Sequence, residues 1–312
     1  MPPRGAKYSS WTFTNIVVNN YVHVLIFTDS DLDGAGSALF LKEVYAGHDV
    51  IVVETTEYSI LNEFKNRWNT LDHFAKIFVC DLSLNEEQAI AINRENVVVI
   101  DHHETHAKFV DKYTIAKAIV KPYTSNTKLV FDTFKSKIDV TPDKEALVEL
   151  IDQYDSWSFD FPRELAPAKL NAIYYGYNKP KAIKFIESFK DGLREYTPHE
   201  KGAIKLHFKN FVEQLEYPKF AGMIKDYKVV STFITANVNE IANYMLDKYD
   251  ADVAIMVNLE VKAVTFRKKK GVQLNLGKLA EKLCDGGGSH ILAGGKLTDT
   301  FANFTKTLTP IS

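Results

Sequence analysis

The chain has 312 residues, enough for about two domains that bury hydrophobic cores without disulfides or metal ions as staples. Hydrophobic residues make up 46% of it and charged residues 25%, which excludes a largely disordered protein. The 38 Lys and Arg residues against 40 Asp and Glu residues give a formal net charge of −2, which argues against a protein that coats long nucleic acid.

The cysteines and the N-terminus bear on the cellular compartment. Cys80 and Cys284 lie far apart in the sequence and neither belongs to a C-x-x-C pair, which favours a reducing environment. Residues 1–7 are followed by polar residues rather than by an apolar signal segment, and no stretch reaches ~18 uninterrupted apolar residues. We therefore expect a soluble, cytoplasmic protein that makes no contact with a membrane.

The first half of the chain alternates short Val- and Ile-rich runs with helical patterns, which predicts repeated βαβ units and a parallel sheet. Apolar residues at helical spacing predict helices over 36–45 and 85–93, and a longer helix over 143–154 that starts at or near Pro142. Because the crossovers are short, the strands should lie side by side in one sheet. The predicted strands cover residues 22–28, 50–54, 76–80 and 97–100.

In the second half, a mostly helical stretch over residues 163–215 leads into another α/β unit that begins near Tyr217. Its helices are predicted from an Asn237-x-x-Glu240 capping pattern to Lys248 and over 276–283. Its strands are predicted over residues 229–234, 253–258, 260–267 and 301–307.

The sequence thus predicts an α/β protein in three parts. Residues 1–160 form a domain with a parallel sheet, 161–216 a helical connector, and 217–312 a smaller α/β domain. The most glycine-dense stretch, residues 285–295, lies in the last of these parts, between its final predicted helix and strand.

Acidic and histidine side chains follow the predicted strands of the first part. The carboxyl ends of parallel strands share one edge of a sheet, and ligands bind in the crevice outside it, so we expect these groups to converge there. They are Asp29, Asp31 and Asp33 after the first strand, Asp81 after the third, Asp101, His102 and His103 after the fourth, and Asp152 and Asp155 at the end of the helix over 143–154.

Several carboxylates in one crevice repel one another unless they are protonated or neutralised by cations. A pair of divalent ions is the simplest neutralising group. Oxygen-rich ligation with one or two imidazoles and no thiolate favours Mn²⁺ or Mg²⁺ over a structural zinc, and the nitrogen donor favours manganese. Two such ions activate water and stabilise a leaving oxygen, so the pattern indicates hydrolysis of phosphate esters.

Each cluster has a simpler interpretation when it is taken alone. Asp-rich turns after strands are common, Asp81 could cap the helix that follows it, and the pair His102-His103 could lie on the surface. Four separate clusters at matching strand and helix ends favour a common site over coincidence.

Five motifs appear in a fixed order along the chain: D-x-D-x-D-G within residues 28–37, an aspartate in 79–83, Asp-His-His at 101–103, two aspartates in 151–157 and a glycine-rich loop over 287–295. In these motifs the sequence resembles the DHH phosphoesterase superfamily, which holds RecJ-type exonucleases, nano-RNase and pAp phosphatase enzymes, and cyclic-dinucleotide phosphodiesterases. The last motif is similar to the loop of the DHH-associated C-terminal domain, so the resemblance covers nearly the whole chain.

The resemblance implies two bound Mn²⁺ ions, with Mg²⁺ as the alternative. Asp152 is favoured over Asp155 as the ligand from the fourth motif because it ends the predicted helix, and Asp155 stays open. Asp29 is expected behind the ligands, with direct ligation as the other option. The implied ligands are Asp31, Asp33, Asp81, His102 and one of Asp152 and Asp155.

The remaining motif residues are implied to act on the substrate. Asp101 would orient a neighbouring group, and His103 would contact the phosphate and assist protonation of the leaving oxygen. Arg267 corresponds to a substrate-binding arginine of the family, whereas the lysines at 268–270 are expected in a solvated turn. Glycine backbone amides can approach a phosphate closely, although a tight turn alone would also explain them. The implied substrate-binding loop consists of Gly287, Gly288, Ser289 and His290.

The sequence therefore predicts a two-metal phosphodiesterase or phosphatase acting on short oligonucleotides or small nucleotides. A RecJ-like single-strand exonuclease is the alternative, against which the chain length and near-neutral charge argue. A catalytically silent nucleotide-binding module is the alternative from another class, and it is disfavoured because every implied ligand position is occupied. Substrate identity among RNA, DNA, cyclic dinucleotides and small bisphosphates, the polarity of attack and the oligomeric state stay open.

Overall fold

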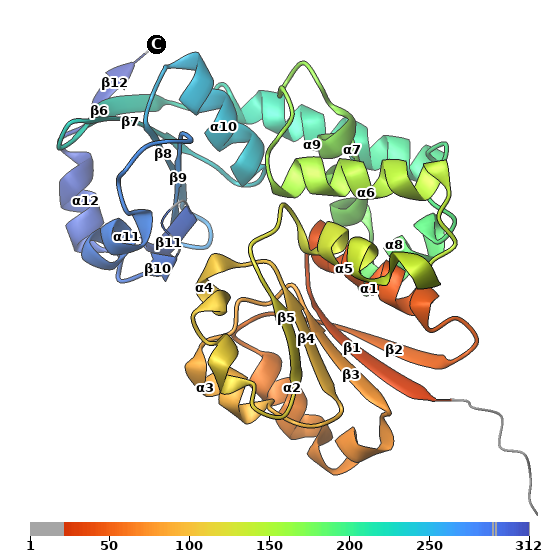
Figure 1. Ribbon diagram of the computed structural model, residues 1–312. Helices are drawn as coiled ribbons and strands as arrows, with labels where there is room; N and C mark the ends of the chain where they lie inside the picture. The colour runs from red at the N-terminus through yellow and green to blue at the C-terminus, as the bar shows by residue number, and fades with distance from the viewer. Residues whose placement is uncertain (1–21, 289, 291, 312) are drawn as a thin grey trace, which may run out of the picture.

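Two β-sheets, one in each half of the chain, organise the computed structural model, which describes residues 22–288, 290 and 292–311 (Figure 1). Helices connect the two sheets and cover their faces. Within these described ranges, none of the helices combines the length and the hydrophobicity that crossing a bilayer requires.

The N-terminal sheet has five parallel strands in the order β2-β1-β3-β4-β5. All strand ends that precede the acidic motifs therefore lie along one edge, as the sequence predicts. The fifth strand was not predicted, because it is short and only half-buried. The strands are β1 (His23–Asp29), β2 (Asp49–Thr55), β3 (Lys76–Cys80), β4 (Val97–Asp101) and β5 (Lys117–Val120).

Both faces of this sheet are covered. Val24 and Ile26 of β1 pack on one side and Leu25 and Phe27 on the other, so successive strand residues are all buried, as is typical of a parallel sheet between helical layers. Helices α1 (Leu32–Val44), α5 (Asn126–Phe134) and α6 (Pro142–Asp155) lie on the first side. Helices α2 (Ile60–Arg67) and α3 (Glu86–Ala91) lie on the second.

The predicted connector is helical. Pro167 and Pro198 lie in the first turns of α7 (Ala166–Gly176) and α9 (Pro198–Gln214), and Pro180 directly precedes α8 (Lys181–Phe189). Proline favours these positions because its missing N–H and fixed φ suit the start of a helix. The prolines therefore divide the connector into three separate helices.

Among the described residues, the C-terminal sheet is mixed and has seven strands in the order β10-β11-β9-β8-β7-β6-β12, of which the β7 and β8 pair is parallel and the other pairs are antiparallel. Helix α10 (Val238–Lys248) covers one face, and α11 (Leu276–Cys284) and α12 (Asp299–Thr305) cover the other. The strands are β6 (Lys219–Ile224), β7 (Tyr227–Phe233), β8 (Val253–Asn258), β9 (Ala263–Lys268), β10 (Gly287–Gly288), β11 (Leu292–Lys296) and β12 (Thr309–Ile311).

Three sequence predictions in this half are wrong. Residues 301–305 belong to α12 (Asp299–Thr305) and 306–307 to the turn after it, rather than to a strand, because the Thr298 hydroxyl caps a helix that buries Phe301. The strand predicted from residue 260 begins at Ala263, because the Asn258 side chain accepts from the amides of the preceding turn. Asn237 has a left-handed backbone and its side chain makes no capping bond to α10.

Glu240 instead joins the two halves of the molecule. Its buried Oε1 accepts hydrogen bonds from the Tyr154 hydroxyl (3.0 Å) at the end of α6 and lies 3.1 Å from His207 Nε2 on α9. Phe161 and Phe211 of the connecting segment pack in the same core as Ile241 of α10. The C-terminal unit is therefore held against the helices that also cover the N-terminal sheet.

Candidate metal centre at the edge of the parallel sheet

The first motif joins β1 to α1 in a tight turn. Asp29 ends β1, and Asp31 caps α1 by accepting a hydrogen bond from the Gly34 amide (2.8 Å). A side chain at position 34 would overlap the carbonyl oxygen of Asp29, so the helix can start this close to the strand only with glycine there. The turn directs Asp33, the next acidic residue, toward the strand ends.

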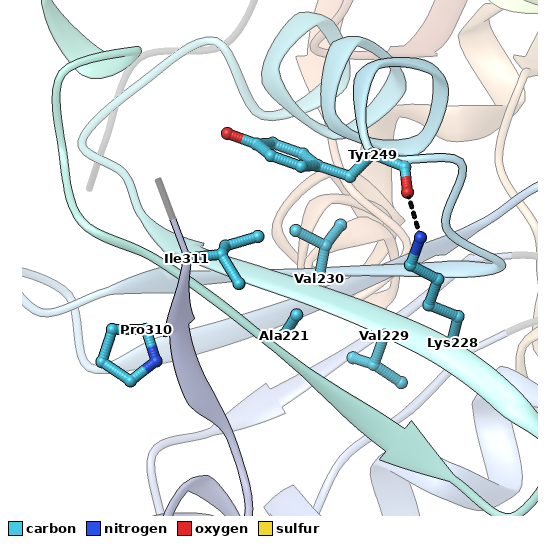
Figure 2. Close-up of a pocket in the computed structure, with 7 residues that line it drawn as sticks. All are labelled: Ala221, Lys228, Val229, Val230, Tyr249, Pro310 and Ile311. Carbon is cyan, nitrogen blue, oxygen red and sulfur yellow. Dashed lines mark hydrogen bonds between the residues drawn. The ribbon is translucent and has the colours of Figure 1, made fainter.

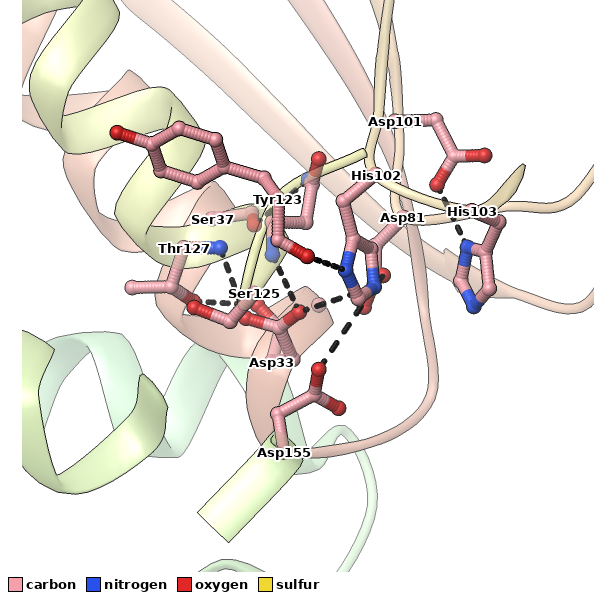
Figure 3. Close-up of polar contacts among 12 residues, drawn as sticks. Asp33, Ser37, Asp81, Asp101, His102, His103, Tyr123, Ser125, Thr127 and Asp155 are labelled. Atoms are coloured by element: carbon pink, nitrogen blue, oxygen red, sulfur yellow. Dashed lines mark hydrogen bonds and ion pairs between the residues drawn. The ribbon is translucent and has the colours of Figure 1, made fainter. Parts of the chain in front are cut away.

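His102 is the centre of the cluster (Figure 3). Its Nε2 lies 3.3 Å from Asp81 Oδ1 and 3.7 Å from both Asp33 Oδ2 and Asp155 Oδ2. Its Nδ1 lies 3.3 Å from the Tyr123 carbonyl oxygen, which can only accept a hydrogen bond. Nδ1 therefore carries the proton, and the lone pair of Nε2 points toward the space between the three carboxylates. This is the arrangement in which a histidine binds a metal ion.

Backbone geometry and a helix end hold two of these carboxylates. Asp81 has a left-handed backbone (φ 59°), an uncommon conformation for a non-glycine residue that is often found at functional sites. Asp33 accepts hydrogen bonds from the amides of Asn126 (2.7 Å) and Thr127 (2.8 Å), the first residues of α5. The positive end of the α5 dipole thus stabilises the Asp33 carboxylate. The sequence analysis missed this support, although Ser125 is a recognisable helix cap.

The two aspartates of the fourth motif have different surroundings. Asp155 faces His102, whereas Asp152 Oδ1 accepts hydrogen bonds from the hydroxyls of Thr124 (2.5 Å) and Ser125 (2.8 Å). Of the two aspartates, Asp155 is therefore the one that the structure places beside His102. Both residues lie at the end of α6, and it is the loop before α5 that engages Asp152 and leaves Asp155 for the cluster.

Like charges crowd this edge. Burial, and next the neighbouring Asp33, raises the pKa of Asp31, of Asp81 and of Asp155 above its ordinary value. Burial, followed by the charge of Asp31, raises the pKa of Asp29 from 3.8 to about 7. Such a cluster binds protons unless a cation takes their place, because buried carboxylates repel one another.

The donor atoms suit a hard divalent cation. Ligand atoms of Asp33, His102 and Asp155 all lie within 4.8 Å of one another, and so do those of a second set that shares His102 and adds Asp81, Asp101 and His103. Carboxylate oxygens with an imidazole nitrogen match Mn²⁺ or Mg²⁺ ligation. Asp29 and Asp31 belong to neither set among the described residues, although Asp31 lines a cavity of about 100 Å³ together with Asp33 and Asp155.

Asp101 and His103 lie beside this cluster. Asp101 is fully buried, with Oδ1 2.7 Å from His103 Nδ1 and Oδ2 2.7 Å from Nδ1 of His106, a residue that the sequence analysis did not single out. Burial raises the pKa of Asp101, but the hydrogen bonds from both histidines outweigh this and lower it overall. Burial lowers the pKa of His103, and the bond to Asp101 more than reverses this, raising it to about 9.

A cleft of about 1140 Å³ separates the two units beside the acidic cluster. His103 and Tyr58 line its N-terminal wall, and Arg267 and the glycine loop line the other wall. The Arg267 guanidinium donates to Asn239 Oδ1 (2.7 Å), and burial lowers its pKa to about 10, so it stays charged at neutral pH. Gly288 has φ 138° and a side chain there would overlap the Leu292 carbonyl oxygen, so the close β10–β11 turn requires glycine.

The rest of the predicted loop lies differently. Ser289 lies outside the described residues. His290 is exposed, its Nδ1 lies 2.6 Å from Lys268 Nζ, and it is not among the described residues that line the cleft. Lys268 also donates to the carbonyl oxygens of Val272 (2.6 Å) and Leu274 (3.0 Å), so it braces the loop and is not the solvated turn residue that was expected.

A further cavity lies at the β12 edge of the C-terminal sheet, opposite the edge formed by β10 (Figure 2). It measures about 450 Å³ and lies between β12, β7 and the end of α10, where Lys228 Nζ donates to the Tyr249 carbonyl oxygen (2.6 Å). No acidic or histidine side chain is among its described lining residues. Its lining therefore lacks the ligands that make the sheet edge a candidate metal centre.

Fold and site together define a two-unit α/β protein with an acidic, histidine-containing centre at the edge of a parallel sheet. Residues 23–153 match the model of the DHH family, N-terminal domain. The match confirms the resemblance for the motifs that lie within residues 23–153, and it does not extend to the glycine-rich loop over 287–295.

Solved structures with the same two-unit fold cover nearly the whole chain. One is a pGpG-specific phosphodiesterase, PggH, from Vibrio cholerae (15% identity over 91% of this chain and 96% of that chain, TM-score 0.59). Another is an exopolyphosphatase-related protein from Bacteroides fragilis (16% identity over 92% of this chain and 91% of that chain, TM-score 0.53). A third is the exonuclease RecJ bound to manganese (12% identity over 91% of this chain and 88% of that chain, TM-score 0.53). No curated protein sequence matches the chain. At these identities the similarity shows the two-unit α/β fold alone.

Proposed function

We propose that this protein is a divalent-metal-dependent phosphodiesterase or phosphatase that hydrolyses phosphate esters of short oligonucleotides or small nucleotides. The observation that carries this is the group of carboxylates around His102 Nε2, which opens beside a cleft whose opposite wall holds a charged arginine and glycine amides. Support comes from the relatives of the same fold, which include a pGpG-specific phosphodiesterase and an exonuclease bound to manganese.

Mn²⁺ is the proposed cofactor, with two ions per site, and Mg²⁺ is the second choice. When bound, the ions neutralise the carboxylates, activate water and stabilise the leaving oxygen. Asp29 and Asp101 stand behind the ligands in this proposal, and Asp152 fixes the loop before α5. The proposed ligands are Asp31, Asp33, Asp81, His102 and Asp155.

The protein's own groups divide the remaining work. His103 is protonated at neutral pH and lies at the cleft wall, so it can donate to a phosphate oxygen or to the leaving oxygen. Arg267 and the amides of Gly287 and Gly288 lie across the cleft and would hold a second phosphate or the far end of the substrate. We accordingly assign catalysis to residues 1–160 and substrate binding to residues 217–312, with 161–216 as the connector.

The test is hydrolysis by protein stripped of metal and then resupplied with Mn²⁺, Mg²⁺, Ca²⁺ or Zn²⁺. The substrates are bis(p-nitrophenyl) phosphate, RNA and DNA from a dinucleotide to a long single strand, cyclic dinucleotides and a small 3′,5′-bisphosphate, ranked by kcat/KM. We expect Mn²⁺ to support the highest turnover and short substrates to rank first.

Two outcomes would replace this function with another. No hydrolysis by metal-loaded protein, with nucleotide binding retained, would indicate a silent binding module. Faster digestion of the long strand than of the dinucleotide would favour a RecJ-like exonuclease.

A further inference from the structure

A chain of three hydrogen bonds, the middle one buried, lies behind His103. His106 and Asp101 are fully buried, and His106 Nδ1 lies 2.7 Å from Asp101 Oδ2. The other ring nitrogen of His106, Nε2, lies 2.7 Å from the hydroxyl of Tyr113. The second oxygen of Asp101 lies 2.7 Å from His103 Nδ1. Four side chains thus form one line from the protein interior to the cleft wall.

The chemistry of these groups fixes where the protons lie. An ionised carboxylate only accepts hydrogen bonds, so both histidines present Nδ1–H to Asp101. His106 Nε2 and the Tyr113 hydroxyl share the next hydrogen bond of the line, at 2.7 Å. Burial, and next the charge of Asp101, raises the pKa of Tyr113, which keeps the phenol in its donor form. Within this line, His103 Nε2 is the polar atom that is left for the cleft.

We infer that His106 and Tyr113 are positioning residues for the hydrolysis proposed above, and that they act through Asp101 to hold the His103 ring with Nε2 toward the cleft. The His103 side chain is 41% exposed and its ring packs against that of His102 (centroids 4.4 Å), and the bond to Asp101 is the hydrogen bond that orients the ring. A carboxylate with one oxygen bound to a ring locked in the core cannot turn, and its other oxygen then fixes the His103 ring. The inference rests on the proposed function of His103.

A purely structural role explains these four residues less well. Burying an ionised carboxylate costs desolvation energy, and buried charge networks are often no more stabilising than apolar side chains of similar volume. A carboxylate and an imidazole at zero exposure beneath the cleft are explained if they orient a group that works in the cleft. The D-H-H-x-x-H spacing supplies the geometry, because the short helix α4 (Glu104–Ala107) brings His106 back under Asp101.

The variants for the test change one link at a time. Tyr113→Phe removes only the outermost donor, His106→Leu removes the link to Asp101, and His106→Asn restores a donor to it. The control is Tyr177→Phe, which removes another phenol hydroxyl bonded to a buried carboxylate, that of Glu200, in the connector. Thermal denaturation and Mn²⁺ titration of each variant report whether folding and metal binding persist.

We expect His106→Leu to lower kcat by about 10- to 100-fold, as for other residues that orient a catalytic group. Tyr113→Phe should lower it less, His106→Asn should recover part of the loss, and KM, Mn²⁺ stoichiometry and the control variant should stay at wild-type values. Wild-type kcat in both folded Tyr113→Phe and His106→Leu would overturn the inference. If His106→Leu does not fold, Tyr113→Phe and His106→Asn decide it.

A second readout does not depend on activity. In ¹H–¹⁵N spectra of the imidazole rings, Tyr113→Phe and His106→Leu should shift and broaden the His103 signals, whereas Tyr177→Phe should not. Unchanged His103 signals would refute the positioning role even if the enzyme were active. Changed signals in a protein that hydrolyses no phosphate ester would uphold the ring-holding network and reject the proposed function instead.

Discussion

The two walls of the cleft differ in their electrostatics. On the N-terminal wall, carboxylates lie close together and burial raises the pKa of Asp81 and Asp155, so the wall is unfavourable until a cation arrives. On the C-terminal wall, the Arg267 guanidinium is already bonded to Asn239, and glycines line most of the loop between Asp285 and Lys296. In the proposed function, metal ions neutralise the N-terminal wall, whereas the C-terminal wall has its arginine paired before a ligand binds.

This difference separates chemistry from binding. Groups that are strained or repelled in the free protein can be stabilised more in the transition state than in the ground state, whereas preformed donors bind both states alike. Substitutions on the N-terminal wall, the acidic wall, should therefore change mainly kcat. Substitutions on the C-terminal wall, which carries Arg267, should change mainly KM. The predictions below test that division, beginning with the change expected to matter most.

Asp81→Asn should lower kcat by about a thousandfold or more, because it removes a proposed ligand from the metal centre. The metal-free variant should melt at the same temperature as the wild type or higher, since one buried like charge is gone. Turnover and chelator-treated melting curves measure both effects. Asp132→Asn is the matched control, because Asp132 is an exposed carboxylate bonded to the Tyr123 hydroxyl outside the cluster. Wild-type turnover in metal-loaded Asp81→Asn would contradict the assignment of the chemical step to the acidic N-terminal wall.

Arg267→Ala should raise KM for nucleotide substrates by about 10- to 100-fold, the equivalent of one hydrogen bond to a charged group. Hydrolysis of bis(p-nitrophenyl) phosphate, which is too small to span the cleft, should change little. Lys269→Ala serves as the control, because Lys269 pairs with Asp250 at an exposed turn. His290→Ala should have a smaller effect than Arg267→Ala, since His290 contacts Lys268. Equal losses on both substrates in Arg267→Ala would place that residue in the chemical step.

The sequence analysis succeeded where one physical rule decides the outcome. Parallel strands must present their carboxyl ends at one edge, so the positions of Asp81 and His102 after β3 and β4 were enough to bring them together. The mostly helical stretch predicted over residues 163–215 is likewise confirmed, by three helices.

It failed where side-chain direction or tertiary burial decides. Asp152 and Asp155 end the same helix, and only the hydroxyls of a loop distant in sequence distinguish them. Nothing in the sequence distinguishes His106 from other polar residues, because its contact with Asp101 depends on the path of the folded backbone. Residues 301–307 alternate enough to resemble a strand, but burial of Phe301 against the C-terminal sheet favours a helix.

Salt dependence should be shallow, because few groups on either wall reach a phosphate without the metal. With Arg267 and His103 as two contacts, log K for a short single strand should fall with log salt at a slope of about −1.4, or roughly sevenfold between about 50 and 200 mM. The apparent affinity of a dinucleotide measured across this range provides the slope. A slope steeper than about −4 would require a basic track that neither wall contains and would favour the exonuclease alternative.

The smallest expected effect is on the stability of the metal-free protein. In the folded state burial raises the pKa of Asp29 from 3.8 to about 7, whereas the unfolded chain keeps the ordinary value. Below about pH 3.8 the Asp29 carboxyl is protonated in both the folded and the unfolded state. As the pH rises toward 7 the unfolded chain releases this proton first, so the increase in pH favours unfolding.

The raised pKa values of Asp81 and Asp155 act in the same direction, and so does His103, whose bond to Asp101 loses strength as the pH approaches 9. Chelator-treated protein should therefore melt at progressively lower temperature, by a few degrees, from about pH 4 to about pH 7. Saturating Mn²⁺ should reverse this trend, because metal binding displaces protons and strengthens as they leave. Asp29→Asn should flatten the metal-free curve only in part, since the other carboxylates remain. A melting temperature independent of pH in chelator would mean that the acidic wall carries no repulsion for a cation to relieve, and the contrast between the two walls would then be one of shape alone.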